Sequence, residues 1–256
     1  SSNSKMNRIK DYKSLAVDVV GWLCRYAHDN NVDSFVVGVS GGIDSAVSST
    51  LAVKTGKPTY LVCMPLNQAK DQETLSDAHM YWLKSNYPNV KVLKANLSET
   101  YAKLMSDLTG EFGLEYTGNP MAKANTKSRL RMVTLYHVAA NVGGIVVGTG
   151  NKVEDYGVGF YTKYGDGGVD IAPIADLYKT EVWELGEYLE VDQRIVDADP
   201  TDGLWIDSRS DEEQLGASYA ELEEAMETGT GPAVEVLKKF NTQNKHKMEP
   251  IPTFKL

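Results

Sequence analysis

One glycine-rich segment combines residue types and spacing that suit phosphate chemistry. Residues 38–45 read Gly-Val-Ser-Gly-Gly-Ile-Asp-Ser and follow an apolar run typical of a buried strand. Backbone N–H groups at a helix start bind anions, and glycines let the backbone approach phosphate oxygens closely. The segment lacks the GxxxxGK[ST] spacing of the kinase P-loop, and Asp44 replaces its lysine. We therefore expect a pyrophosphate cradle with Asp44 as a Mg²⁺ ligand, against the alternative of an ordinary strand-to-helix turn.

A second carboxylate follows another predicted core strand. Residues 147–155 read Val-Gly-Thr-Gly-Asn-Lys-Val-Glu-Asp, which places Thr149 and Glu154 just after that strand. Ligands bind beyond the carboxyl ends of parallel strands, so these residues should face the same crevice as Asp44. Magnesium takes one or two carboxylates together with phosphate oxygens and water. Asp44 and Glu154 are therefore the predicted metal pair, with a solvated acidic loop as the alternative.

The stretch with the most unusual residue order is Thr-Lys-Tyr-Gly-Asp-Gly-Gly-Val-Asp at residues 162–170. It is followed by Ile-Ala-Pro-Ile and then by Leu-Tyr-Lys at residues 177–179. A glycine-rich hairpin with surface charges is the plain alternative, but such a hairpin does not need this residue order.

These segments carry a resemblance to a known family. SGGIDS at residues 40–45 resembles the SGGxDS signature of the ATP-pyrophosphatase (N-type) superfamily, whose members cleave ATP to AMP and pyrophosphate. GMP, asparagine and argininosuccinate synthetases and tRNA-modifying enzymes share that motif, so it does not choose the substrate. Residues 148–154 resemble the GTxxxxE segment, and residues 162–170 the TKYGDGGxD stretch, of ammonia-dependent NAD synthetases. The resemblance extends from about Tyr12 to His246.

The resemblance implies a role for each matching residue. It assigns ATP contacts to Gly38, Val39, Ser40, Gly41, Gly42, Ile43, Asp44, Ser45, Thr149, Lys179 and Thr201. It assigns the magnesium ion to Asp44 and Glu154, and deamido-NAD contacts to Arg129, Lys163, Asp170, His246 and Lys247. Asp44, Lys179 and Asp170 are the expected catalytic residues, with Asp170 binding or deprotonating ammonia. Arg131, two residues beyond Arg129, is expected to face elsewhere on its helix.

The implied reaction converts deamido-NAD, ATP and ammonia to NAD, AMP and pyrophosphate. The nicotinate carboxylate attacks the α-phosphorus of ATP, and ammonia then displaces AMP from the adenylylated intermediate. Ammonia, not glutamine, is the expected donor, because neither Cys24 nor Cys63 has the setting of a nucleophile and no glutaminase domain is apparent. The alternatives are a tRNA-modifying adenylylating enzyme and a nucleotide-binding module without turnover.

The elements that must position these residues alternate between strand and helix. Short apolar runs predict strands at residues 34–40, 59–64, 90–95 and 143–148. Helical spacing predicts helices over residues 15–26, 45–55, 72–85, from 98 onward, 121–142 and 179–189. Residues 156–168 are expected to form a loop, and residues 199–213 a mobile segment over the site.

Strands that alternate with helices require crossover connections. The predicted fold class is therefore α/β, with a doubly wound, mostly parallel sheet and helices on both faces. The resemblance implies the adenine nucleotide alpha hydrolase-like version of that fold, and a homodimer.

Composition sets the remaining expectations. The 256 residues suit one domain over residues 1–256, and residues 1–5 are set aside as an expected expression remnant. A net charge of -9 argues against nucleic acid as a partner. No apolar run reaches the roughly 20 residues that span a bilayer. We therefore expect a cytoplasmic protein with small-molecule substrates and no membrane partner.

Overall fold

The sheet contains four parallel strands. The structure is a computed structural model that describes residues 7–67, 70–205 and 209–256. Residues 1–5, set aside above, lie outside the described residues. The strands are hydrogen-bonded in the order β3-β2-β1-β4, and their bounds are β1 (Ser34–Gly38), β2 (Thr59–Cys63), β3 (Val90–Lys94) and β4 (Gly144–Val147).

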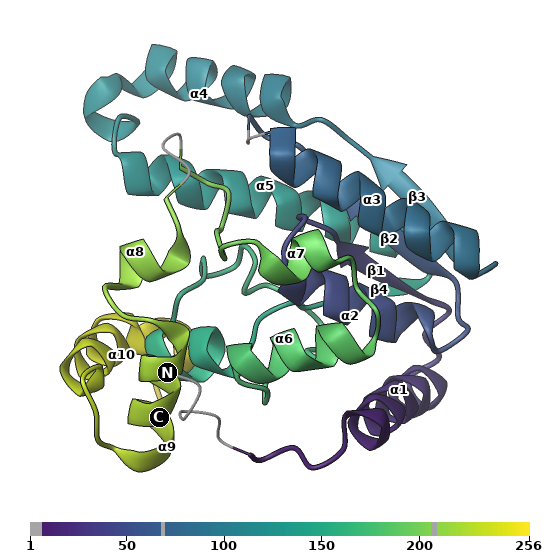
Figure 1. The fold of residues 1–256 in the computed structure, drawn as a ribbon. Helices are drawn as coiled ribbons and strands as arrows, with labels where there is room; N and C mark the ends of the chain where they lie inside the picture. The colour runs from purple at the N-terminus through teal and green to yellow at the C-terminus, as the bar shows by residue number, and fades with distance from the viewer. Residues whose placement is uncertain (1–6, 68–69, 206–208) are drawn as a thin grey trace.

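Helices connect and surround these strands (Figure 1). In chain order they are α1 (Tyr12–Asp29), α2 (Ile43–Val53), α3 (Lys70–Asn86), α4 (Ser98–Phe112), the 3-10 helix η2 (Leu114–Tyr116), α5 (Pro120–Asn141), the π-helix η3 (Val153–Val158), α6 (Lys179–Tyr188), α7 (Gln193–Asp197), α8 (Asp211–Leu215), α9 (Tyr219–Thr228) and α10 (Val234–Met248).

Both faces of the sheet are covered, which confirms the predicted fold class. Successive side chains of a strand point to opposite faces. In β1, Phe35 and Val37 join a core formed with α1, α2, α3 and α6. Val36 points the other way and packs with Val62 and Val146 against α5. The four strands are fully parallel, as the crossover connections require.

A second apolar cluster lies beside the sheet domain. It is built from η3, α8, α9 and α10 around buried Tyr178, Tyr219 and Leu222. Figure 1 shows α8, α9 and α10 gathered on the side of the molecule away from the strands. Partly buried Trp183 of α6 packs against both clusters and joins them. The single-domain organisation expected from the sequence stays a prediction.

The four predicted strands and six predicted helices are all present, with ends shifted by a few residues. One expectation needs correction: residues 156–158, predicted as loop, belong to η3. The segment at residues 199–213, predicted to be mobile, contains the start of α8 at Asp211. The mobility of that segment stays a prediction, and residues 206–208 lie outside the described residues.

The strand order places β1 beside both β2 and β4. The chain leaves β1 toward β2 and reaches β4 only after β3, so the connections diverge between β1 and β4. A crevice at the carboxyl ends of strands forms at such a switch point. None of the helices in the described part of the chain is long and apolar enough to cross a membrane. The cytoplasmic location stays a prediction.

Candidate active site

The cradle segment lies where β1 turns into α2. Gly42 caps α2 with extended backbone, and Ile43 is its first residue. The hydroxyl oxygens of Ser40 and Ser45 lie 3.2 Å apart, and the Ser40 N–H donates to Ser45 Oγ at 3.1 Å. This serine contact closes the turn around the first N–H groups of the helix. Such N–H groups can bind an anion, and the phosphate-binding role of the segment stays a prediction.

Only glycine suits position 41. Its φ of +90° is a conformation that residues with a side chain rarely adopt, and a Cβ there would lie 2.4 Å from the carbonyl oxygen of Gln72. That carbonyl belongs to the first turn of α3. Gly41 therefore allows α3 to approach the cradle closely.

Asp44 and Glu154 meet at one end of the cradle, and Asn151 connects them. Asn151 Nδ2 donates to Glu154 Oε1 at 2.8 Å and lies 3.4 Å from Asp44 Oδ1. Glu154 lies on η3, which is a π-helical turn. Such turns are rare in proteins, but where they occur they are often at functional sites. Burial raises the pKa of Glu154, and the negative charge of Asp44 raises it further. The two carboxylates therefore repel each other, and a cation between them would relieve that repulsion.

Lys179 neutralises part of this charge. Its Nζ lies 2.6 Å from Asp44 Oδ2, and the whole residue is only 3% exposed. Burial lowers the pKa of Lys179, but the charges of Asp44 and Glu154 outweigh it and the net pKa is raised. The lysine is therefore a permanent cation beside the cradle.

The N-terminal segment fixes the helix that carries Lys179. The Tyr178 N–H at the start of α6 donates to Glu181 Oε1 at 2.8 Å. Arg8 Nη2 donates to the same oxygen at 2.8 Å and Arg8 Nε to Oε2 at 3.0 Å, while its guanidinium lies 4.4 Å from the centre of the Tyr178 ring. A paired fork of this kind is geometrically specific. Arg8 therefore holds the first turn of α6 in place.

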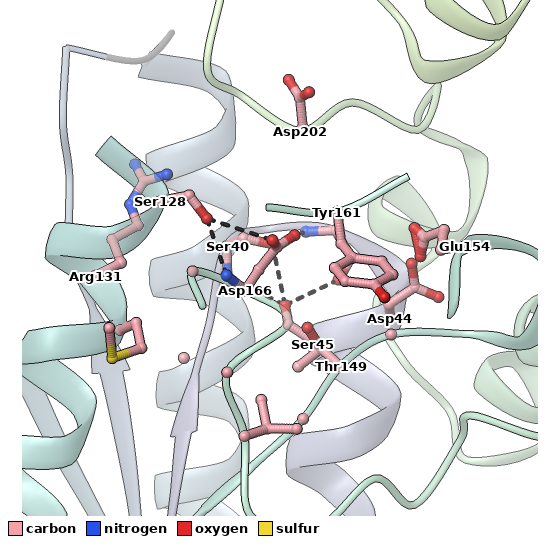
Figure 2. A pocket seen from close by; sticks show the side chains of 18 of the residues that line it. Ser40, Asp44, Ser45, Ser128, Arg131, Thr149, Glu154, Tyr161, Asp166 and Asp202 are labelled. Carbon is pink, nitrogen blue, oxygen red and sulfur yellow. Dashed lines mark hydrogen bonds between the residues drawn. The ribbon is translucent and has the colours of Figure 1, made fainter. Parts of the chain in front are cut away.

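Asp44, Glu154 and Lys179 line a cleft of about 220 Å³ at the carboxyl ends of the strands. Figure 2 shows Asp44 and Glu154 at one end, Arg131 at the other, and Asp166 between them. Among the predicted ATP and metal residues, the cleft is lined by Gly38, Val39, Ser40, Gly42, Ile43, Asp44, Ser45, Thr149, Glu154, Lys179 and Thr201. Gly41 shapes the cradle from behind.

A second cavity of about 340 Å³ adjoins the cleft. Both are lined by Asp155, Tyr161 and Asp166, which form the boundary between them. The predicted substrate lysines, Lys163 and Lys247, line this second cavity. The Lys247 ammonium donates to the carbonyl oxygen of Tyr161 at 2.7 Å, and the acidic Asp155, Asp166 and Glu249 line the same cavity. The phosphate contacts of both lysines stay predictions.

Three predicted substrate residues do not line either cavity. Arg129 donates from Nε to the carbonyl oxygen of Lys163 at 3.1 Å. The exposed Asp170 accepts from the Tyr136 hydroxyl at 2.8 Å and from the Val146 N–H at 2.9 Å. The carbonyl oxygen of His246 accepts from Lys163 Nζ at 3.3 Å. Their substrate roles stay predictions.

Arg131 faces a different side of α5 from Arg129, as expected, but it is Arg131 that lines the cleft, which the sequence analysis did not predict. Its Nε donates to the carbonyl oxygen of Met64 at 3.1 Å. Ser128, Met132 and Leu135 line the cleft as well. These four positions follow the i, i+3, i+4, i+7 spacing of one helical face, so the side of α5 that faces the cleft could have been recognised from the sequence.

Three further acidic residues that line the cleft were missed: Asp155, Asp166 and Asp202. Burial raises the pKa of Asp155 to about 7, helped by the charge of Asp166. Desolvation by the surrounding protein also raises the pKa of Asp166, although the Thr162 N–H donates to its Oδ1 at 2.6 Å. Asp166 occurs inside the TKYGDGG stretch, whose unusual order was the available signal.

Comparison with known proteins is consistent with this arrangement. The sequence matches the NAD synthase family over residues 15–252, which is most of the chain. The chain belongs to the NAD synthase family. The family relative from Carboxydothermus hydrogenoformans, an NH3-dependent NAD+ synthetase, is 39% identical over 90% of this chain and 92% of its own length.

Solved structures show the same fold. An NMN synthetase from Francisella tularensis superposes with a TM-score of 0.87 at 32% identity, covering 97% of this chain and 100% of that one. An NAD+ synthetase from Burkholderia pseudomallei gives a TM-score of 0.74 at 24% identity, covering 93% and 90%. The second likeness bears on the fold alone.

Proposed function

We propose that this chain catalyses the ATP-dependent amidation of deamido-NAD with ammonia, giving NAD, AMP and pyrophosphate. The observation that carries the proposal is the convergence of the cradle, Lys179 and the Asp44–Glu154 pair on one cleft. The curated relative that is 39% identical is an NH3-dependent NAD+ synthetase.

A divalent cation fits the Asp44–Glu154 pair. No group of three or more acidic, histidine or cysteine side chains among the described residues could hold a metal by itself. Magnesium in nucleotide sites needs only one or two carboxylates, because substrate phosphates and water complete its shell. Asp44 and Glu154 would hold Mg²⁺, which would offset the negative charge of the triphosphate when bound.

The residues of the chain then orient the reactants. The backbone N–H groups at residues 40–45 and the Lys179 ammonium would bind the triphosphate and leave its α-phosphorus accessible. Lys163 and Lys247 would hold the phosphates of the dinucleotide in the second cavity. The nicotinate carboxylate would thus meet the α-phosphorus at the boundary between the cavities, and positioning would supply most of the catalysis.

Ammonia must reach the adenylylated carboxylate at the same boundary. Two carboxylates line both cavities there, Asp155 and Asp166, whereas Asp170 lines neither. Either of the two could bind ammonium and accept a proton as the C–N bond forms, and the ammonia role that the resemblance gives to Asp170 stays a prediction. AMP then leaves with the carboxylate oxygen that attacked phosphorus.

Oxygen labelling tests this route. Deamido-NAD with heavy oxygen in its nicotinate carboxylate should transfer one labelled oxygen to the phosphate of AMP in a single turnover with ATP, Mg²⁺ and ammonium. Label in inorganic phosphate would indicate an acyl-phosphate route and contradict the proposal. The same reaction with glutamine and an ammonia scavenger should yield no NAD.

A second substrate deserves a direct comparison. The likeness to the Francisella tularensis NMN synthetase, at a TM-score of 0.87 over 97% of this chain, favours a mononucleotide. We therefore propose nicotinate mononucleotide as the alternative acceptor. Measuring kcat/KM for both compounds under the same conditions decides between them, and a higher value for the mononucleotide would overturn the choice of deamido-NAD.

The homodimer implied by the sequence resemblance is also a proposal. Large apolar side chains are exposed where α4, η2 and α5 meet: Phe112 is 59% exposed, Leu114 72% and Tyr116 73%. No residue of α4 is buried. Since contiguous exposed apolar surface marks interaction sites, we propose that a second copy covers this face. Leu114→Asp should convert a dimer to a monomer in light scattering, and an unchanged mass for the variant would reject this face.

A further inference from the structure

The Lys179 ammonium lies in a compartment formed by more than Asp44. Its Nζ is 5.1 Å from the centre of the Tyr219 ring and 5.7 Å from that of Trp183. The two rings pack edge to face, with centroids 6.1 Å apart. Aromatic faces attract a cation, so these rings restrict where the ammonium can move.

Asp211 completes this compartment. It is the first residue of α8 and only 4% exposed. The Tyr219 hydroxyl donates to its Oδ2 at 3.0 Å, whereas its Oδ1 has no hydrogen-bond partner among the described residues. A buried carboxylate oxygen without a partner is costly, so its retention calls for an explanation.

The charges of Asp211 and Lys179 act on each other. Burial raises the pKa of Asp211 to about 6, and the positive charge of Lys179 opposes that rise. Asp211 is in turn one of the three acids that raise the pKa of Lys179. No ion pair within 4.0 Å joins the two groups among the described residues; Tyr219 connects them, because its ring faces the Lys179 ammonium and its hydroxyl donates to Asp211.

Substrate binding would change the hydrogen-bond partners of the Lys179 ammonium. In this structure Asp44 accepts one of its three ammonium N–H groups. A cation held by Asp44 would compete with that hydrogen bond once the triphosphate is bound. An anion on the opposite side of the ammonium would then keep the lysine oriented toward phosphate.

We propose that Asp211, oriented by the Tyr219 hydroxyl, is a positioning residue that holds the Lys179 ammonium in place when ATP and its cation occupy the cleft. The inference rests on the ATP chemistry proposed above. The backbone at Asp211 also contacts the wall of the cleft. The Asp211 N–H donates to the carbonyl oxygen of Pro200 at 2.8 Å, and the next residue, Thr201, lines the cleft.

A double-mutant cycle tests the proposal through Lys179. Asp211→Asn removes the charge and keeps an oxygen that can accept from Tyr219. Glu213→Gln, in the same first turn of α8, is the matched control, because glutamine at this position keeps the capping box. Single-turnover AMP formation and ATP affinity are measured for both, with Lys179 intact and in the Lys179→Ala background.

Asp211→Asn should slow AMP formation about tenfold or more without weakening ATP binding, because removing a negative charge does not disfavour an anion. In the Lys179→Ala background the same substitution should change the rate less than twofold. Equal effects in both backgrounds, or a Glu213→Gln effect of similar size, would overturn the positioning role.

A measurement without turnover separates this inference from the proposed function. The 15Nζ signal of Lys179, assigned by its loss in Lys179→Ala, should remain sharp when Mg²⁺ and α,β-methylene-ATP are added to the wild type. It should broaden in Asp211→Asn with the same additions. If wild type forms no AMP but shows this difference, the function is wrong and the positioning role stands; an unchanged signal in Asp211→Asn overturns the role.

Discussion

Glu223 gives the protein a pH-dependent stability that one substitution should remove. It lies on α9 facing α6 and is 1% exposed. One carboxylate oxygen accepts from the Thr180 hydroxyl, and the other has no hydrogen-bond partner among the described residues. Burial raises the pKa of Glu223 from 4.5 to about 7, and the hydrogen bond from Thr180 only partly opposes it. Near neutral pH the fold must therefore hold a poorly solvated carboxylate.

The direction of the effect follows from proton linkage. The folded state binds this proton more tightly than the unfolded state, so the contribution of Glu223 is fully favourable below pH 4.5 and is lost as pH rises through about 7. A pKa difference of this size lowers the free energy of unfolding by about 3 kcal/mol from a pH well below both pKa values to a pH well above them. About 2.5 kcal/mol of that loss falls between pH 5 and pH 8. Gln has the same shape and does not titrate.

Urea unfolding of wild type and Glu223→Gln at pH 5 and pH 8 measures this. The stability of the variant relative to wild type should increase by about 2 to 3 kcal/mol from pH 5 to pH 8, whatever constant offset the buried amide adds. Glu187→Gln, on the exposed side of α6, should show no such increase. Parallel pH dependences for wild type and Glu223→Gln would refute the reasoning.

Three further substitutions test the cleft and its supports. Gly41→Ala should abolish ATP binding measured by calorimetry, because its Cβ meets a carbonyl of α3, whereas Gly56→Ala, also at positive φ but with open space, should cost only about 1 kcal/mol and leave binding intact. Asp44→Asn should lower kcat about a hundredfold or more while the variant remains folded, and wild-type turnover at limiting Mg²⁺ would exclude a ligand role. Arg8→Met should lower the free energy of unfolding by about 2 kcal/mol, because the buried Glu181 carboxylate loses both hydrogen bonds from the guanidinium. A loss below about 0.5 kcal/mol in urea titration would contradict the stabilising role of the Arg8–Glu181 pair.

The sheet and the cradle could be predicted because their signals are local. Each strand is a short apolar run of the kind found in sheets covered on both faces, and residues 38–45 encode both the turn and its anion-binding chemistry. Parallel topology then brings the ends of β1 and β4 together, so Asp44 and Glu154 could be paired from sequence alone.

What the sequence did not reveal depends on how helices rotate and bury their charges. Arg129 and Arg131 differ by two positions, and only the docking of α5 on the sheet decides which one faces the cleft. Asp211 lies in a polar stretch, and its burial results from packing among α8, α9 and α6. Helices α9 and α10 were not predicted, because their polar sequences are stabilised by that same packing.

The order in which the chain is synthesised bears on when the cleft can work. Lys179 and Asp44 are separated by 135 positions, and Arg8 and Glu181 by 173. A growing chain therefore presents the cradle and both carboxylates before the ammonium that neutralises them has left the ribosome. Until then the negative charges of Asp44 and Glu154 repel a triphosphate, and Arg8 cannot form its ion pair with Glu181. The complete cleft can therefore form only after Lys179 and Glu181 have been synthesised.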